Sequence, residues 1–219
     1  RGKVPLLVGG TMMYYKALMD GLASLPVSEP ALRQQLEQEI QDQGLAAMHA
    51  RLCAIDAVAG ARINATDPQR ITRAMEVFLL SGETLTTHWS RQKQQPLPYQ
   101  VTSIGVWPPD RALLHHRIEQ RYEIMLQQGF KREVESLMAR GDLNIDLPSM
   151  RCVGYRQMWQ YLAGECDYST MQYKGVVATR QLAKRQLTWL RSWPELQVFD
   201  SLDTKLSFKV LQLFDRIER

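Results

Sequence analysis

The order of helical and strand-like segments is the feature that most limits the folds open to this chain. Val4–Val8, Tyr99–Trp107 and Gln197–Phe199 are short apolar runs typical of strands, near the start, the middle and the end. Between the first two, residues 31–90 show only helical patterns. This order predicts an α/β core that carries an all-helical insertion.

The first predicted strand lies unusually close to the start of the sequence. The chain opens at Arg1 without an initiator Met and passes directly into Val4–Val8. Three strands are fewer than the five or six of a typical sheet, so we expect further N-terminal strands to be missing. We expect residues 1–24 and 98–219 to form the core and residues 25–97 to form the insertion domain.

Composition excludes several classes of protein. With 45% hydrophobic and 23% charged residues, the chain has the balance of a globular protein and not of a disordered one. No apolar run approaches the roughly 20 residues of a membrane-spanning helix. The three cysteines form no CxxC pair, which indicates reduced thiols in a cytoplasmic protein.

Positive charge is concentrated in one part of the chain. Residues 150–193 hold seven basic and two acidic side chains, a net charge of +5 compared with +4 for the whole sequence. Aromatic residues, among them Tyr173 and Trp189, are interleaved with the basic ones. Proteins bind phosphate backbones and stack unpaired bases with such mixtures, so a nucleic acid is a candidate partner. The alternative is a solvated helix face with buried aromatic residues.

Two further segments have the chemistry of an anion site. Gly9-Gly10-Thr11 follows the first predicted strand and precedes a predicted helix, although no GK[ST] follows as in a Walker loop. Arg117 and Arg121 lie one turn apart on the helix after Asp110, and we expect Arg121, beside an apolar stripe, to be partly buried. A diphosphate would suit these guanidinium groups, whereas a tight turn and an arginine–carboxylate pair are the structural alternatives. The four histidines do not have the spacing of a metal site.

Five motifs occur in an order that is specific when they are taken together. They are VGGTMMYY at 8–15, DPQR at 67–70, RIEQR at 117–121, RCVGYR at 151–156 and TRQLAKRQLTWL at 179–190. The set closely resembles the bacterial tRNA dimethylallyltransferases of the tRNA isopentenyltransferase family, from residue 1 to about residue 193.

The resemblance implies a fold and a reaction. The expected fold is α/β, with a P-loop NTPase-like core and an all-helical insertion domain, and the family's P-loop and general-base Asp would precede Arg1. The expected reaction transfers a dimethylallyl group from dimethylallyl diphosphate to N6 of the adenosine next to the anticodon in tRNA, assisted by Mg²⁺. We also expect a cytoplasmic monomer that does not bind membranes. This chain alone would be inactive without the P-loop and the Asp.

The resemblance also assigns site residues by position. Thr11 corresponds to an active-site residue near the target adenine, and Arg121, with Arg117 beside it, corresponds to the diphosphate-binding group. The segments expected to contact the tRNA anticodon arm comprise Thr11, Arg33, Gln69, Arg70, Ile71, Thr72, Arg73, Arg151, Cys152, Val153, Gly154, Tyr155, Arg156, Lys184, Arg185, Gln186, Leu187, Thr188, Trp189, Leu190 and Arg191.

Two alternative functions remain open at the level of the sequence. A P-loop kinase that lacks its N-terminal part would have a similar core, but the basic and aromatic residues of 150–193 argue against a small-molecule kinase. A non-catalytic RNA-binding module would have no need for Arg121 beside an apolar stripe.

Overall fold

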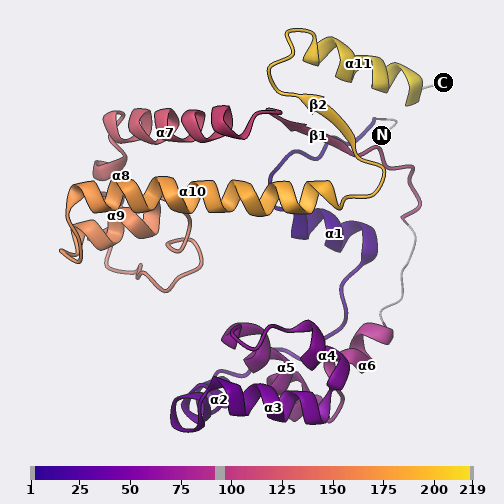
Figure 1. Ribbon diagram of the computed structural model, residues 1–219, viewed down its shortest axis with the longest axis vertical. Coiled ribbons are helices and arrows are strands. Elements are labelled where there is room, and N and C mark those ends of the chain that lie inside the picture. Colours follow the sequence, from indigo (N-terminus) through magenta and orange to yellow (C-terminus); the bar gives the residue numbers. More distant parts are fainter. Residues whose placement is uncertain (1–2, 92–96, 218–219) are drawn as a thin grey trace. The chain divides into compact units, whose positions relative to one another are not determined.

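The computed structural model describes residues 3–91 and 97–217 (Figure 1). Contacts divide the chain into two compact units. Unit 1 comprises residues 1–12 and 100–219, and unit 2 comprises residues 13–99. The predicted division into a core and an insertion at residues 25 and 97 is close to these bounds but stays a prediction.

Unit 1 contains a small parallel sheet. β1 (Ile104–Trp107) pairs with β2 (Gln197–Asp200), with Ile104 opposite Gln197 and Trp107 opposite Asp200. β1 begins later than predicted, and β2 lies where the third strand was expected. Parallel strands separated by a long connection are the arrangement of an α/β protein.

The predicted strand at Val4–Val8 is wrong for this structure. These residues join no ladder with the described part of the chain, and Leu6 and Val8 are 68% and 85% exposed. A parallel strand depends on hydrogen-bonded neighbours and on covered faces, and the described residues supply neither to this run.

Five helices complete the described part of unit 1: α7 (Arg111–Gln127), α8 (Phe130–Ala139), α9 (Tyr155–Leu162), α10 (Tyr168–Arg191) and α11 (Leu206–Ile217). Asp110 and Asp167 cap α7 and α10 by accepting backbone N–H bonds, as expected for aspartate at these positions. The sequence also predicts a helix over residues 149–163, but α9 begins only at Tyr155, because residues 149–154 form turns and Gly154 has φ 95°.

The core of unit 1 lies between α7, α8, α9 and α10. Its buried members are Tyr122, Phe130, Val134, Met158 and Met171. The Tyr122 hydroxyl donates to Met171 Sδ at 3.4 Å, and a Cβ added at Gly175 would lie 2.1 Å from the Tyr122 oxygen. Gly175 therefore lets α7 and α10 approach closely. Burial raises the pKa of Tyr122 to about 12.

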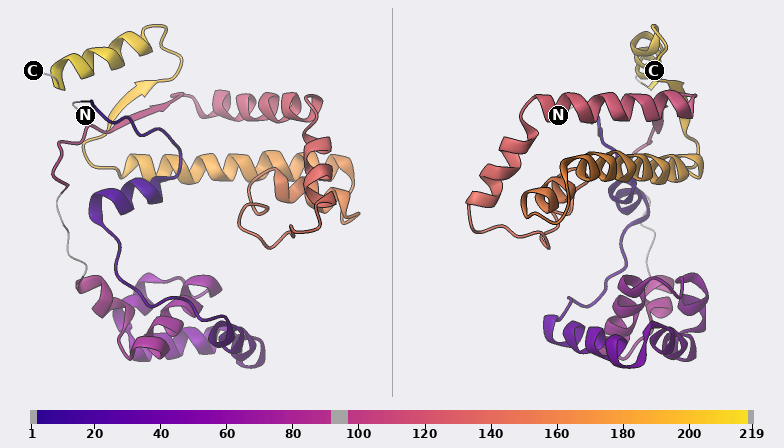
Figure 2. Two further views of the ribbon diagram at one scale, coloured as in Figure 1. Left: turned by 180° about the vertical axis from the view of Figure 1, so that it is seen from behind. Right: turned by 60° about the vertical axis from the view of Figure 1, so that its left-hand side comes forward.

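Unit 2 is built from helices, seen from two further sides in Figure 2. They are α1 (Met12–Asp20), whose first residue falls in unit 1, α2 (Pro30–Gln43), α3 (Leu45–Ile55), α4 (Ala57–Arg62), α5 (Pro68–Ser81) and α6 (Leu85–Ser90). The core contains Leu36, Leu52, Ile71 and Met75, each at most 1% exposed. The sequence also predicts a helix that opens at Asp67-Pro68 and closes at Ser81-Gly82. α5 confirms it, with Asp67 as N-cap, Pro68 in the first turn and a left-handed Gly82 after the helix.

α4 was not predicted, because its six residues are too short for a periodic pattern. Asp56 caps this helix by accepting a hydrogen bond from the Ala59 N–H, and the same carboxylate accepts from the Thr86 N–H and hydroxyl. Burial opposes the charge of Asp56, but these hydrogen bonds outweigh it and lower the pKa of the carboxyl below its usual 3.8. Among the described residues, no helix is long and apolar enough to cross a membrane.

Candidate active site and nucleic-acid interface

Two of the predicted site segments meet in unit 1. The Gln186 side chain of α10 donates a hydrogen bond of 2.9 Å to the Gly10 carbonyl oxygen. The contact holds the Gly9-Gly10-Thr11 loop against the second half of α10. Thr11 is exposed, so a ligand beside this helix can reach the residue.

The second half of α10 presents positive charge next to that loop. Lys184, Arg185 and Arg191 are exposed, and no ion pair holds them within the described part of the chain. Trp189 is 39% exposed, whereas Gln186, Leu187 and Leu190 are half-buried. Thr188 is exposed, but its hydroxyl donates to the Lys184 carbonyl within the helix. The segment therefore combines unpaired cations with a partly accessible aromatic ring.

Arg117 and Arg121 lie on α7, and the expected partial burial of Arg121 is wrong. Both side chains are exposed, and the buried residues of this helix are Ile118 and Tyr122. Neither has a hydrogen-bond or ion-pair partner among residues 3–91 and 97–217. The carboxylate of the same motif, Glu119, instead pairs with Arg180 of α10. The two arginines are therefore available to an anion from outside the chain.

Some residues of the segment 151–156 are bonded within the protein, and others are free to contact a partner. Gly154 is buried, and its N–H donates to the Gln157 side chain. Tyr155 donates its hydroxyl to Glu133, and this hydrogen bond, together with burial, raises the pKa of the tyrosine. Arg151 is held by Asp146 at 3.1 Å.

The remaining predicted members of this segment differ in accessibility. Cys152 is exposed and Val153 is half-buried. Arg156 is exposed and has no ion-pair partner in the described residues. It is thus the cation of the segment that is free to meet a phosphate.

The predicted residues of unit 2 divide into buried and exposed groups. Ile71 and Thr72 are buried, with exposed fractions of 0% and 3%, so their side chains cannot contact a partner in this structure. Gln69 and Arg70 are exposed, and Arg70 pairs with the helix cap Asp67 at 2.7 Å. Arg33 is paired with Glu37, at 3.2 Å.

Arg73, an expected tRNA contact, is not the free cation that this role requires. One of its terminal nitrogens lies 2.6 Å from a Glu76 oxygen, and the other donates to the Pro26 carbonyl at 2.7 Å. Glu76 is completely buried and also accepts from the Ser28 hydroxyl at 2.5 Å and from the Glu29 N–H at 3.0 Å. The guanidinium group of Arg73 is thus occupied within the protein.

Sequence reasoning missed Glu76, although the sequence holds a sign of it. The residue is a lone carboxylate inside the apolar run 74–78, between Met75 and Val77. Burial alone would raise its pKa, but the hydrogen bonds from Ser28, Arg73 and Glu29 together lower it below the usual 4.5. The carboxylate therefore stays ionised as the centre of a buried cluster.

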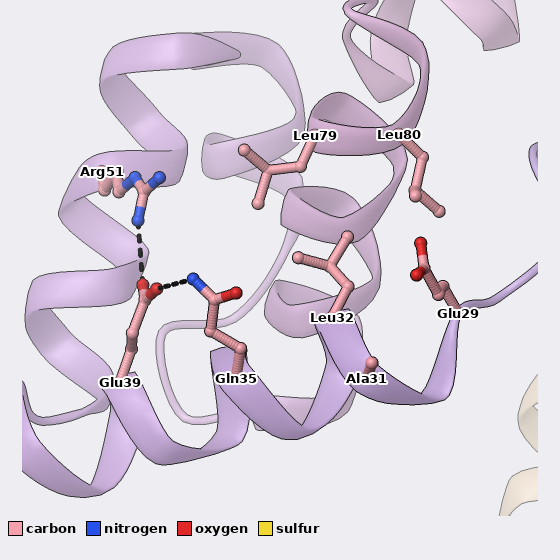
Figure 3. Close-up of a pocket in the computed structure, with 8 residues that line it drawn as sticks. All are labelled: Glu29, Ala31, Leu32, Gln35, Glu39, Arg51, Leu79 and Leu80. Atoms are coloured by element: carbon pink, nitrogen blue, oxygen red, sulfur yellow. Dashed lines mark hydrogen bonds and ion pairs between the residues drawn. The ribbon is translucent and has the colours of Figure 1, made fainter.

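A shallow pocket lies elsewhere in unit 2, between α2, α3 and α5 (Figure 3). Leu32, Leu79 and Leu80 provide its apolar wall, and Glu39 binds Gln35 and Arg51 at its rim. None of the predicted site residues lines this pocket, so the pocket does not belong to the candidate site.

The residues that the structure describes do not form a metal site. No three His, Cys, Asp or Glu side chains among them lie close enough together to hold an ion. The Mg²⁺ that the resemblance implies stays a prediction, because this ion is usually held by one or two carboxylates together with substrate phosphates.

Comparison with known proteins identifies relatives of the whole arrangement. The family model described as IPP transferase matches residues 1–193. The full-length tRNA isopentenylpyrophosphate transferase of Bacillus halodurans is similar at 27% identity and a TM-score of 0.56, over 94% of this chain and 63% of that one. This chain therefore spans less than two thirds of that relative.

Two further solved structures share the fold at lower identity. The tRNA delta(2)-isopentenylpyrophosphate transferase of Staphylococcus epidermidis has 24% identity and a TM-score of 0.58, over 99% of this chain and 70% of that one. A eukaryotic dimethylallyltransferase acting on tRNA has 20% identity and a TM-score of 0.76, over 99% of this chain and 57% of that one.

Proposed function

The chain belongs to the IPP transferase family, and from this membership we propose that the protein transfers a dimethylallyl group from dimethylallyl diphosphate to N6 of the adenosine next to the anticodon in tRNA. The observation that carries the proposal is the hydrogen bond from Gln186 to the Gly10 carbonyl oxygen. It brings an exposed Thr11 together with the unpaired cations of α10, so a candidate reaction centre lies beside a candidate RNA-binding surface.

We propose that the complete protein has a P-loop NTPase-like core, with further strands and the general-base Asp N-terminal to this chain. Two features support this proposal. β1 and β2 are parallel, as in the sheets of such cores. The apolar run Val4–Val8 is exposed and has the composition of a strand that needs covered faces.

The proposed reaction is a displacement at the first carbon of the dimethylallyl group. The N6 lone pair forms the new C–N bond while the C–O bond to diphosphate breaks, and the bonding electrons leave with the diphosphate. The leaving group gains negative charge in the transition state, so a guanidinium group beside it lowers the barrier. Arg121, with Arg117 one turn earlier, supplies that charge because no carboxylate of the described chain competes for it.

Thr11 is proposed to orient the attacking amine. Its hydroxyl can accept a hydrogen bond from the N6 amino group, which directs the nitrogen lone pair toward the electrophilic carbon. The proton lost from N6 then passes to the general base outside this chain. The target base must leave its stack to reach such a site, and the basic residues of α10 would hold the distorted anticodon loop.

The proposed partner is the anticodon arm of tRNA, and we propose that the protein acts in the cytoplasm as a monomer. Exposed and unpaired cations at Arg156, Lys184, Arg185 and Arg191 support binding to an RNA backbone. Such binding must weaken as salt rises, because each phosphate contact releases counterions from the RNA.

The test is the transfer of labelled dimethylallyl diphosphate to a tRNA transcript by the complete protein. Arg121→Ala should lower kcat/KM for the diphosphate substrate by roughly 10- to 100-fold, since a charge-assisted contact contributes about 1.5–3 kcal/mol. Arg111→Ala, an exposed arginine at the start of the same helix, is the matched control and should keep wild-type kinetics.

Three outcomes would contradict the proposal. Equal kcat/KM values for Arg121→Ala and wild type would refute the diphosphate assignment. Phosphoryl transfer from ATP to a small molecule would favour the kinase. Binding of tRNA without any transfer by the complete protein would favour the RNA-binding module.

A further inference from the structure

The composition of α10 is unusual along its whole length. The helix contains Lys174, Arg180, Lys184, Arg185 and Arg191 but no acidic residue. Its 24 residues extend for about 36 Å. A helix of this length without a single acidic side chain cannot neutralise its own cations through pairs one turn apart.

The basic residues of α10 fall on one broad face. Tyr173, Arg180, Lys184 and Arg191 follow one another at intervals of seven, four and seven residues, which is one row along a helix. Lys174 and Arg185, eleven residues apart, form a second row beside it. The same face thus begins two turns before Arg180 and continues to the last residue of the helix.

Burial separates this face from the packed side of the helix. Met171 and Gly175 are buried against the core of unit 1. Tyr173 is 69% exposed, and Lys174 is exposed as well. Within the described residues, Arg180 is the one cation of α10 with an ion pair, and its partner Glu119 belongs to α7. The ion pair of Arg180 therefore holds the middle of this face, whereas the cations toward both ends of the helix have no ion pair among the described residues.

We infer that the RNA-binding surface of α10 extends beyond Lys184–Arg191 to Tyr173 and Lys174 in the first turns of the helix. The inference rests on the proposed function, because it takes tRNA as the polyanion that the protein binds. Charge complementarity selects a nucleic acid backbone, since the face presents cations along the helix with few large apolar groups between them. Lys174 contacts a phosphate, and the Tyr173 hydroxyl donates to a phosphate or ribose oxygen.

Filter binding of a full-length tRNA transcript over a salt series tests this inference. For Lys174→Ala, the dissociation constant should rise several-fold, and the slope of log K against log salt should fall by roughly 0.9, the value for one lost phosphate contact. Lys174→Arg retains the charge and should restore the wild-type slope. Tyr173→Phe removes only a neutral hydroxyl, so it should weaken binding while the slope stays unchanged.

Lys131→Ala is the matched control. It removes one lysine charge from unit 1, but Lys131 lies on α8, where it faces Glu135 at 3.6 Å and the Tyr161 ring at 5.7 Å. It should keep the wild-type slope. If Lys174→Ala also keeps that slope while Lys184→Ala lowers it, the extension to Lys174 is wrong and tRNA binding stands. If the wild-type protein shows no salt-dependent tRNA binding, the proposed function itself fails, and the inference fails with it.

Discussion

Replacing Glu76 by glutamine is a conservative change in size and shape, but it should strongly destabilise unit 2. The carboxylate is fully buried and is the common partner of Arg73, Ser28 and Glu29. Breaking a buried ion pair costs about 3–5 kcal/mol when one charge is left without its partner. Arg73 is 30% exposed and keeps its bond to Pro26, and glutamine keeps one acceptor oxygen. We therefore expect a loss of about 2–3 kcal/mol in the free energy of unfolding.

Hydrogen exchange and thermal unfolding would measure this loss together. For a domain of this size the melting temperature should fall by about 8–24 °C. The Glu29 amide, which donates to Glu76, should exchange much faster in Glu76→Gln than in wild type. Arg70→Ala is the control from the same helix, because Arg70 is 75% exposed and its removal should change stability by less than about 0.5 kcal/mol.

The same carboxylate gives the stability of unit 2 a defined dependence on pH. Because the pKa of Glu76 is lower in the folded state than its usual 4.5, its contribution is complete above that value and is lost as pH falls through the lowered pKa. Glu76→Gln should remove this part of the acid sensitivity. A melting temperature and a pH profile both equal to those of wild type would refute the buried cluster as a source of stability.

Three further predictions concern unit 1. Joint replacement of Lys184 and Arg185 by alanine should lower the salt slope of tRNA binding by roughly 1.4–1.8, and an unchanged slope would show that neither contacts phosphate. Thr11→Ala should reduce kcat with tRNA affinity nearly intact, whereas wild-type turnover and melting temperature in Thr11→Asn would show that the residue only supports the helix start. Gly175→Ala should cost about 1–3 kcal/mol of stability in denaturant titrations, because the added Cβ meets the buried Tyr122 ring, and an unchanged midpoint would contradict this close packing.

The helices were predictable where local chemistry agrees with packing. α5 and α7 begin after the aspartate caps that the sequence indicates, and α5 buries the stripe that contains Ile71 and Met75. Caps and periodic stripes act within a few residues, so one sequence is enough to recognise them.

The errors lie where an element depends on groups far away in the sequence. Val4–Val8 has strand composition, but a strand forms only where a ladder partner exists. The helix predicted from Ser149 starts six residues late, because the left-handed Gly154 and its bond to Gln157 fix a turn. α4 exists because Asp56 is buried between Ala59 and Thr86, a contact that bridges residues thirty positions apart.

The sequence was enough to predict which residue types occur in the candidate site. It was not enough to predict which of their side chains lack a partner within the protein. Arg70 and Arg73 are neighbours on one side of the same helix, and both were expected to contact tRNA. The difference arises from Pro26, Ser28 and Glu29, which lie more than forty residues earlier and enclose Glu76 beside Arg73. A sequence pattern shows which side chains share a face, whereas the tertiary fold decides which of their charges are already neutralised.

The motif RIEQR at 117–121 illustrates why that distinction matters for function. Its carboxylate, Glu119, bonds Arg180 of α10, and its two arginines keep no partner in the described chain. Had Glu119 instead paired with Arg117 or Arg121, α7 would have lost both its ion pair with α10 and an available guanidinium group. One acidic residue on the packed edge of α7 thus fixes the helix and leaves the opposite edge positive. This matters for the proposed diphosphate site, because a guanidinium already neutralised by a carboxylate could stabilise a developing charge only after breaking that pair.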